Sequence, residues 1–232
     1  MRRSFWTALF DVVAPRQCVC CQRRLSVTQS ILCTSCRLHL PLTHFEHQSA
    51  DNELARRFWG IMPIERAAAW FFYEPQSEAA QLIYDLKYHY RPDIGREAGR
   101  MAALQLAREG FFTGIDAIVP VPLSRRRQWQ RGYNQSNEIA RGISDATGLP
   151  IYADVVKRRH FRQSQTHLSQ WQRLANTETA FHLVKGEKVS GKHLLLVDDI
   201  VTTGATIIAL ADELAKAEDV KFSVFALGYT KS

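Results

Sequence analysis

Residues 194–206 have the sequence Leu-Leu-Leu-Val-Asp-Asp-Ile-Val-Thr-Thr-Gly-Ala-Thr. Four apolar residues in succession at 194–197 predict a buried parallel strand, because such a strand is covered on both faces of its sheet. Two carboxylates, Asp198 and Asp199, follow where this strand is expected to end. After a turn, apolar residues recur at helical spacing. The stretch therefore predicts a strand, a short turn rich in acidic and hydroxyl side chains, and a helix over residues 204–217.

The predicted turn has the chemistry of a site for a phosphorylated sugar. Backbone N–H groups at a helix N-terminus attract a phosphate, and the helix dipole adds to this attraction. A glycine lets the backbone come close to the ligand, and threonines supply hydroxyl donors. The two aspartates would repel a phosphate, but they can accept hydrogen bonds from the vicinal hydroxyls of a ribose. The turn therefore indicates a ribose 5-phosphate site, whose candidate residues are Asp198, Asp199, Thr202, Thr203, Gly204, Ala205 and Thr206.

A simpler interpretation is an ordinary helix N-cap after a core strand, where threonine or aspartate is common. This interpretation accounts for one residue of the turn, but not for two carboxylates and three threonines. The turn contains neither the Gly-Lys-Thr/Ser of a Walker loop nor Gly-x-Gly-x-x-Gly, so NTPase and dinucleotide-binding sites have no support.

All five cysteines are close together near the start of the chain. Cys18 and Cys21 form one Cys-x-x-Cys pair, and Cys33 and Cys36 form a second. Two such pairs predict a closed, structural four-thiolate zinc site, although the gap between the pairs is slightly shorter than is common. Disulfide bonds are the alternative, and a reducing cytoplasm disfavours them. Cys20 is the odd thiol and could replace one of the ligands.

A further motif follows the strand expected at 115–119. It begins Pro120-Val121-Pro122-Leu123 and ends, after three arginines and Trp129, with Arg131-Gly132-Tyr133-Asn134-Gln135. Residues 197–206 resemble the phosphoribosyl pyrophosphate (PRPP) loop of type I phosphoribosyltransferases. With its cysteine pairs and these two motifs, the whole chain resembles the ComF (competence protein F, GntX-like) family of phosphoribosyltransferase-like proteins.

The resemblance implies roles for further residues. It places Arg131 and Gly132 at the pyrophosphate loop, where the leaving phosphates need positive charge and amide donors. Lys87 resembles a family lysine near the active site, with a solvated helix-end lysine as the alternative. Arg131 and Lys87 are therefore the candidate catalytic residues. The resemblance also implies Mg²⁺, bound mainly by oxygens of PRPP and water, and a mobile loop over 161–172 that closes on the substrate.

Two basic clusters follow the strands expected at 115–119 and near Val155. If both strands belong to one parallel sheet, the clusters lie near each other at one edge of it. They could bind single-stranded DNA, with aromatic side chains stacking on bases. They could equally be solvated loops or serve the pyrophosphate alone. The DNA-binding candidates are Arg125, Arg126, Arg127, Trp129, Lys157 and Arg158.

The order of the predicted elements indicates an α/β fold, with a type I phosphoribosyltransferase-like parallel sheet flanked by helices and a small N-terminal zinc module. Right-handed crossovers would place the ligand at the carboxyl ends of the strands. We expect an N-terminal helix and zinc module over 1–50, a linker and hood-like helical segment over 51–113, and the phosphoribosyltransferase-like core over 114–232. The expected strands are 67–73, 115–119, about 155–156, 194–197 and 222–227. The expected helices are 77–89, 94–109, 135–147 and 204–217.

Composition and charge agree with a soluble globular protein. Of the 232 residues, 46% are hydrophobic and 23% are charged. A net charge of +7 suits an anionic partner, but it is too small to establish nucleic-acid binding. No apolar run reaches membrane-spanning length. The first residues resemble a signal peptide, but Asp11 interrupts the apolar run, so we expect an amphipathic start (Phe5, Leu9) and a cytoplasmic protein.

Two functions compete at this stage. The first is a phosphoribosyltransferase, or a PRPP-binding relative of one, and no residue identifies the nitrogen nucleophile that would accept the ribose. The second is a single-stranded-DNA-binding competence factor without turnover, in which PRPP is an effector or a vestige. The ComF resemblance implies a link to natural transformation, with the DNA-uptake machinery as a possible partner, and both functions can hold together.

Overall fold

The computed structural model describes residues 15–159 and 180–231. Its centre is a four-stranded parallel sheet in the order β1-β6-β5-β2, which confirms the expected α/β fold. The strands are β1 (Ile64–Phe72), β2 (Ala117–Pro120), β5 (His193–Val201) and β6 (Lys221–Tyr229). The predicted N-terminal amphipathic segment and loop 161–172 lie outside the described residues.

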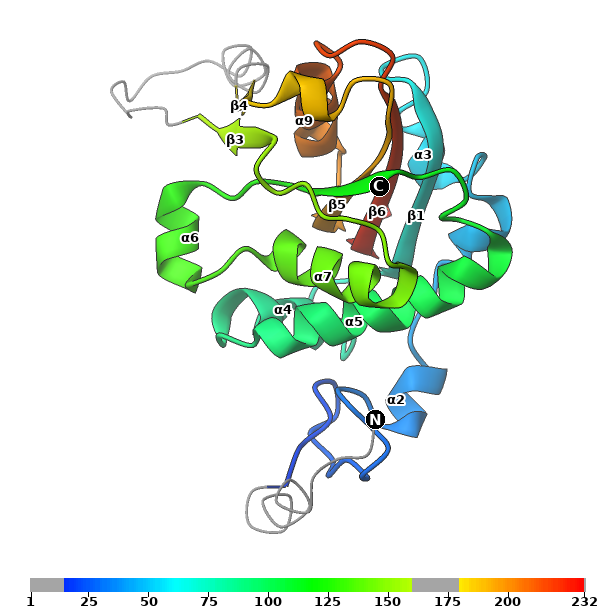
Figure 1. Ribbon diagram of the computed structural model, residues 1–232. Coiled ribbons are helices and arrows are strands. Elements are labelled where there is room, and N and C mark those ends of the chain that lie inside the picture. The colour runs from blue at the N-terminus through cyan, green and yellow to red at the C-terminus, as the bar shows by residue number, and fades with distance from the viewer. Residues whose placement is uncertain (1–14, 160–179, 232) are drawn as a thin grey trace.

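Helices cover both faces of this sheet (Figure 1). The first face carries α4 (Ala80–Tyr88), α5 (Pro92–Leu106) and α7 (Gln135–Thr147), and the second carries α9 (Ala205–Leu214). Among the shorter helices are α2 (Thr34–Leu38), α3 (Glu53–Arg56) and α6 (Arg125–Arg131), with 3-10 turns η1 (Phe45–Gln48), η2 (Ala107–Glu109) and η3 (Gly186–Lys188).

Close packing of α5 against α7 brings the two helices into backbone contact. A Cβ added at Gly99 would lie 2.3 Å from the carbonyl oxygen of Ile139, and one at Gly142 would lie 1.9 Å from that of Arg96. The two helices therefore touch backbone to backbone, which only glycine permits. This contact holds the first turn of α7 beside the end of β5.

The prediction that residues 155–156 form a strand of the core sheet is wrong. Val156–Arg158 forms β3, which pairs in antiparallel fashion with β4 (Phe181–Leu183) in a separate two-stranded sheet. Ile151 lies beside β2 instead, where it forms a single parallel bridge with Ile118. Alternating apolar periodicity cannot distinguish these two arrangements in so short a run.

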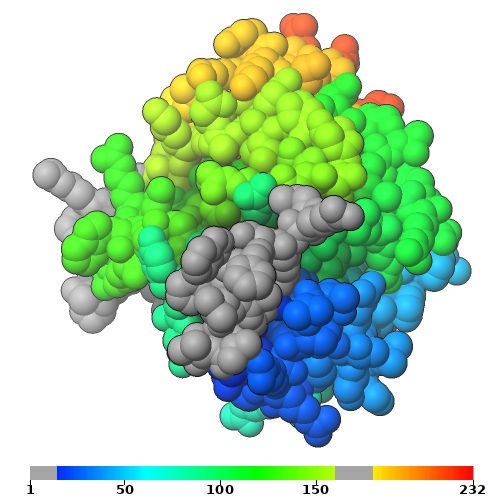
Figure 2. Space-filling model, turned by 60° about the horizontal axis from the view of Figure 1, so that its bottom comes forward, coloured from blue at the N-terminus to red at the C-terminus, as the bar shows by residue number. Residues whose placement is uncertain are grey.

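The other edge of the sheet is formed by β1. β1 pairs with β6 along its length, although it lies in the segment expected to form a linker and hood. The sheet therefore does not begin at residue 114. The cysteine-containing segment shares the main core through Val19, Ile31 and Leu32, and Figure 2 shows this blue segment directly against the green helical layer.

Candidate functional site

The loop between β5 and α9 encloses a small hollow of about 40 Å³, lined by residues 200–207 and Asp198. β5 continues to Val201, so Asp198 and Asp199 lie inside the strand, close to its C-terminal end, rather than beyond it. Gly204 caps α9 in the left-handed conformation with φ of 82°. A Cβ there would lie 2.9 Å from the buried ring of Phe58, so both backbone conformation and packing require glycine.

The carboxylate of Asp198 is fixed by two donors. Ser136 Oγ, in the first turn of α7, donates to Asp198 Oδ1 at 3.1 Å, and the backbone N–H of Asp199 donates to the same oxygen at 2.9 Å. Burial and the neighbouring Asp199 charge together raise the pKa of Asp198 to about 7. Sequence reasoning stopped at Gln135 and missed Ser136, which is the next residue of the same motif.

Asp199 is paired with the candidate catalytic lysine. Lys87 Nζ, from the last turn of α4, lies 3.1 Å from Asp199 Oδ1. Their side chains are only 20% and 14% exposed, so water screens the pair weakly. The solvated helix-end alternative therefore does not describe Lys87, whose charge is directed at the carboxylates of β5.

The segment expected as a pyrophosphate loop is mostly helical. Ser124 caps α6, and its Oγ accepts from the backbone N–H of Arg127 at 3.3 Å. Gly132 ends the helix in the left-handed conformation with φ of 74°. The run of arginines and glutamines lacks the apolar periodicity that identifies a helix from sequence, so the cap was the available signal.

Arg131 reaches back toward α4. Its Nη1 donates to Gln135 Oε1 at 2.8 Å, and its guanidinium lies 5.6 Å from the centre of the Tyr88 ring. Tyr88 follows Lys87 directly, so one helix end contacts both Arg131 and Asp199. The structure thus brings the two candidate catalytic residues to the same end of α4.

Exposed tyrosines surround this meeting point, and sequence reasoning missed them. Tyr84, Tyr88 and Tyr90 are 50%, 63% and 69% exposed. The rings of Tyr84 and Tyr88 are 5.0 Å apart between centroids. Tyr90 packs edge-on against Tyr133 at 5.7 Å. We call Tyr84, Tyr88 and Tyr90 the tyrosine cluster. Their spacing follows no motif, and only their exposure beside a basic helix identifies them.

The DNA-binding candidates lie partly together. Arg125, Arg126, Arg127 and Trp129 are exposed on α6, and Trp129 is 87% exposed. On β3, Lys157 is exposed and Arg158 is half-buried, with its guanidinium 5.3 Å from the centre of the Phe181 ring.

Arg158 connects the basic residues to the loop after β5. Burial, and then the charge of Arg127, lower the pKa of Arg158, while the charge of Asp198 acts in the opposite direction. Arg158 is therefore close enough to sense both α6 and the carboxylates. The two basic clusters do lie near each other, although not because β3 belongs to the parallel sheet.

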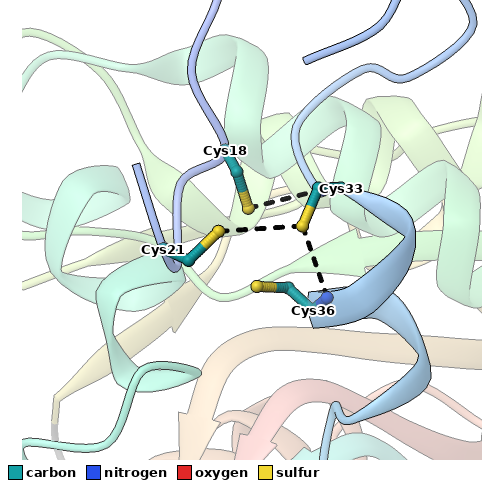
Figure 3. A group of neighbouring side chains, drawn as sticks. All are labelled: Cys18, Cys21, Cys33 and Cys36. Carbon is teal, nitrogen blue, oxygen red and sulfur yellow. Dashed lines mark hydrogen bonds between the residues drawn. The ribbon is translucent and has the colours of Figure 1, made fainter. Parts of the chain in front are cut away.

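The four predicted zinc ligands converge at one point, with all four sulfurs within 4.8 Å of one another (Figure 3). The Sγ atoms of Cys21 and Cys33 are 3.7 Å apart, close to the roughly 3.8 Å between sulfurs placed 2.3 Å from a tetrahedral zinc ion. The backbone N–H of Cys36 donates to Cys33 Sγ and lowers the pKa of that thiol to about 7, whereas burial raises the pKa of Cys36. The cluster is compatible with a four-coordinate metal site.

Cys20 lies outside this cluster. Burial is the main cause that raises the pKa of its thiol to about 12, so it stays protonated at neutral pH. The four sulfurs that converge are those of Cys18, Cys21, Cys33 and Cys36, which favours Cys18 and Cys21 over Cys20 as ligands. None of the five cysteines, all of which the structure describes, forms a disulfide.

Known proteins resemble this chain over most of its length. The family model "Phosphoribosyl transferase domain" matches residues 93–227. "DNA utilization protein YhgH" of Escherichia coli K12 is 32% identical over 90% of this chain and 88% of the relative. The chain belongs to the ComF family of phosphoribosyltransferase-like proteins.

Other members of the ComF family cover the chain to different extents. "Competence protein F" of Haemophilus influenzae is 27% identical over 91% of this chain and 96% of the relative. "Competence protein ComFC" of Streptococcus pneumoniae is 39% identical over 45% of this chain and 44% of the relative. Within the described ranges of this ComF-family chain, no helix has the length and apolar composition needed to cross a bilayer.

Proposed function

We propose that this ComF-family protein binds PRPP with Mg²⁺ and acts in DNA uptake. The observation that carries the proposal is the pair of carboxylates at the end of β5 beside a glycine-capped helix start. In this proposal the backbone of residues 202–206 and the threonine hydroxyls hold the 5-phosphate. Asp198 and Asp199 accept hydrogen bonds from the ribose hydroxyls.

We assign the pyrophosphate end of PRPP to Arg131, Gly132 and Lys87. Arg131 and Lys87 bring two positive charges to the tip of α4, where a pyrophosphate would need them. Lys87 would exchange its contact with Asp199 for one with a phosphate when the ligand binds. Mg²⁺ would be held mainly by phosphate oxygens and water, because it keeps much of its hydration shell.

The test is calorimetric titration of the full chain with PRPP, with and without Mg²⁺. We expect a 1:1 complex that weakens when Mg²⁺ is removed, and the absence of PRPP binding would overturn the proposal. A screen for pyrophosphate release with candidate nitrogen bases then separates a transferase from a protein that only binds PRPP.

A second function, direct binding of single-stranded DNA, is favoured by the exposed side chains around the same site. The arginines of α6 and the tyrosine cluster combine positive charge with exposed rings, which is how proteins bind single strands without sequence preference. Each stacked base would contribute about 1–3 kcal/mol. The ComF relatives with competence and DNA-utilization names support this role.

DNA binding has its own test, a titration with fluorescent single-stranded oligonucleotide at several salt concentrations. Binding through phosphates should weaken steeply as salt increases, and PRPP should compete if the two ligands share Arg131 and Arg158. Replacing Arg126 and Arg127 by alanine should weaken DNA binding and leave PRPP affinity unchanged. If the protein binds no DNA at low salt but still binds PRPP, direct DNA binding is wrong and PRPP binding remains as the proposed function.

A further inference from the structure

A second group of potential metal ligands in the described residues surrounds η1, away from the cysteines and from the loop after β5. Ligand atoms of His44, Glu46 and His47 all lie within 4.8 Å of one another. His44 Nδ1 is 3.6 Å from Glu46 Oε1. Donor atoms placed about 2.0–2.1 Å from a tetrahedral zinc ion are about 3.3–3.4 Å apart. The spacing in this group is therefore close to what zinc requires.

Glu46 is a buried carboxylate. Its side chain is 4% exposed. Gln105 Nε2 donates to Glu46 Oε1 at 2.6 Å, and Trp70 Nε1 donates to Gln105 Oε1 at 3.3 Å. Within residues 15–159 and 180–231, the ion-pair partner found for Glu46 is His44, and no lysine or arginine pairs with it. A buried carboxylate is costly without a compensating positive charge, and a metal ion would supply one.

The two histidines are arranged around this carboxylate. His44 has φ of 56°, a left-handed conformation that is uncommon for residues other than glycine. The rings of His44 and His47 are stacked, with centroids 6.0 Å apart and an interplanar angle of 13°. Glu109 Oε2 lies 3.6 Å from His47 Nδ1 and adds a second negative charge near the group. Both carboxylates favour a cation here.

The three side chains line one wall of a cavity of about 780 Å³. Apolar side chains, including those of Leu40, Trp70 and Met101, line other parts of it. This volume is within the range of small-molecule sites, and so is the combination of an apolar lining with a few polar groups. The ligand group is therefore accessible to a molecule in the cavity.

We propose that His44, Glu46 and His47 bind a divalent ion of the zinc class at the wall of this cavity. Imidazole nitrogen and carboxylate oxygen are donors that zinc accepts. Gln105, itself hydrogen-bonded by Trp70, orients Glu46 as the hydrogen-bond partners of metal ligands do. Three protein ligands leave a fourth tetrahedral position for water or an anionic group of a cavity ligand. This site is independent of the proposed function, because it shares no residue with the PRPP or cysteine sites.

The test uses the full chain after its cysteine cluster has been saturated with zinc. Calorimetric titration with additional Zn²⁺ should show a second equivalent. The variant His44→Ala/His47→Ala should lose this equivalent and keep the first, and both exposed side chains can be removed without creating a core cavity. Glu46→Gln keeps the size of the side chain and should weaken the second equivalent by at least about tenfold, as the loss of even an outer partner of a ligand does.

The matched control is His182→Ala. His182 is also exposed and also faces a buried carboxylate, Glu213, with Nδ1 3.8 Å from Oε1, but within residues 15–159 and 180–231 it belongs to no group of three potential metal ligands. This control should retain both equivalents. A native chain that binds one zinc only, or a histidine double variant that still binds two, would show that His44 and His47 form ordinary ion pairs with Glu46 and Glu109.

Discussion

Lys87 Nζ lies 3.1 Å from Asp199 Oδ1, so the end of α4 is linked to the end of β5 by a mostly buried ion pair. The pair sits where the proposed PRPP phosphates and ribose would meet. It holds the two side chains against each other in the free protein, and in our proposal Lys87 turns from Asp199 to an incoming phosphate.

Replacing Lys87 by methionine should lower the stability of the protein. Asp199 would then remain partly buried without its cation, and the free energy of unfolding should fall by about 1–3 kcal/mol. Urea denaturation measures this change. The double variant Lys87→Met/Asp199→Asn should lose less stability than the sum of the single variants, because neither charge is then left alone. Strict additivity would mean that the two side chains are not coupled.

The double variant Asp198→Asn/Asp199→Asn should abolish PRPP binding and preserve the fold. Asparagine keeps the shape of aspartate, but its amide has one acceptor oxygen instead of two and no charge, so the ribose hydroxyls lose half of their acceptors and the charge that strengthens those hydrogen bonds. Calorimetry gives the affinity, and circular dichroism checks the fold. Asp51→Asn is the control, since Asp51 pairs with Arg56 on the surface. Unchanged affinity in the double variant would remove these carboxylates from the site.

The raised pKa of Asp198 predicts how stability depends on pH. Burial and the neighbouring Asp199 move this pKa from 3.8 to about 7, so between these values the folded protein binds more protons than the unfolded chain. The contribution of Asp198 to the free energy of unfolding should therefore fall as pH rises from about 4 to about 7, and should level off above that. Comparing Asp198→Asn with the native chain by urea denaturation across this range isolates the effect. A difference between the two proteins that does not change with pH would contradict it.

Metal analysis should find zinc at the cysteine cluster in addition to any zinc at η1. In the His44→Ala/His47→Ala background we expect about one zinc per chain, the number for one closed four-thiolate site. Cys20→Ser should retain this zinc, whereas Cys33→Ser should lose it and lower the melting temperature, because the small module has little core of its own. Loss of zinc in Cys20→Ser would show that the fourth ligand was assigned to the wrong thiol.

The loop after β5 was predictable because its signals are local. One short stretch holds a run of apolar residues, two carboxylates, and a glycine followed by a helical stripe. Together these signals predict a strand, a turn and a helix without reference to distant residues. The cysteine cluster was predictable for the same reason, since the spacing within each pair sets which thiols can converge.

Other parts depended on contacts between distant residues. Val155 and Val156 begin a basic stretch that fits a core strand or an edge hairpin equally well, and only pairing with Phe181–Leu183 decides between them. Ser136 and the tyrosine cluster acquire their roles from the packing of α7 beside β5 and of α4 beside α6. Nothing in the sequence around Glu46 distinguishes it from a surface glutamate. Its hydrogen-bond partner Gln105, and Trp70 behind Gln105, are distant in the sequence.

The position of β6 between β1 and β5 has a consequence for how the protein folds as it is synthesised. β1 leaves the ribosome early, but the strand that it pairs with in this sheet, β6, is made after the other three strands. Until residues 221–229 emerge, β1 exposes an unpaired apolar edge, and such edges attract other chains. Closure of the sheet by its last strand should therefore be a late event, and a nascent chain stalled before Lys221 should be protected by a chaperone or aggregate.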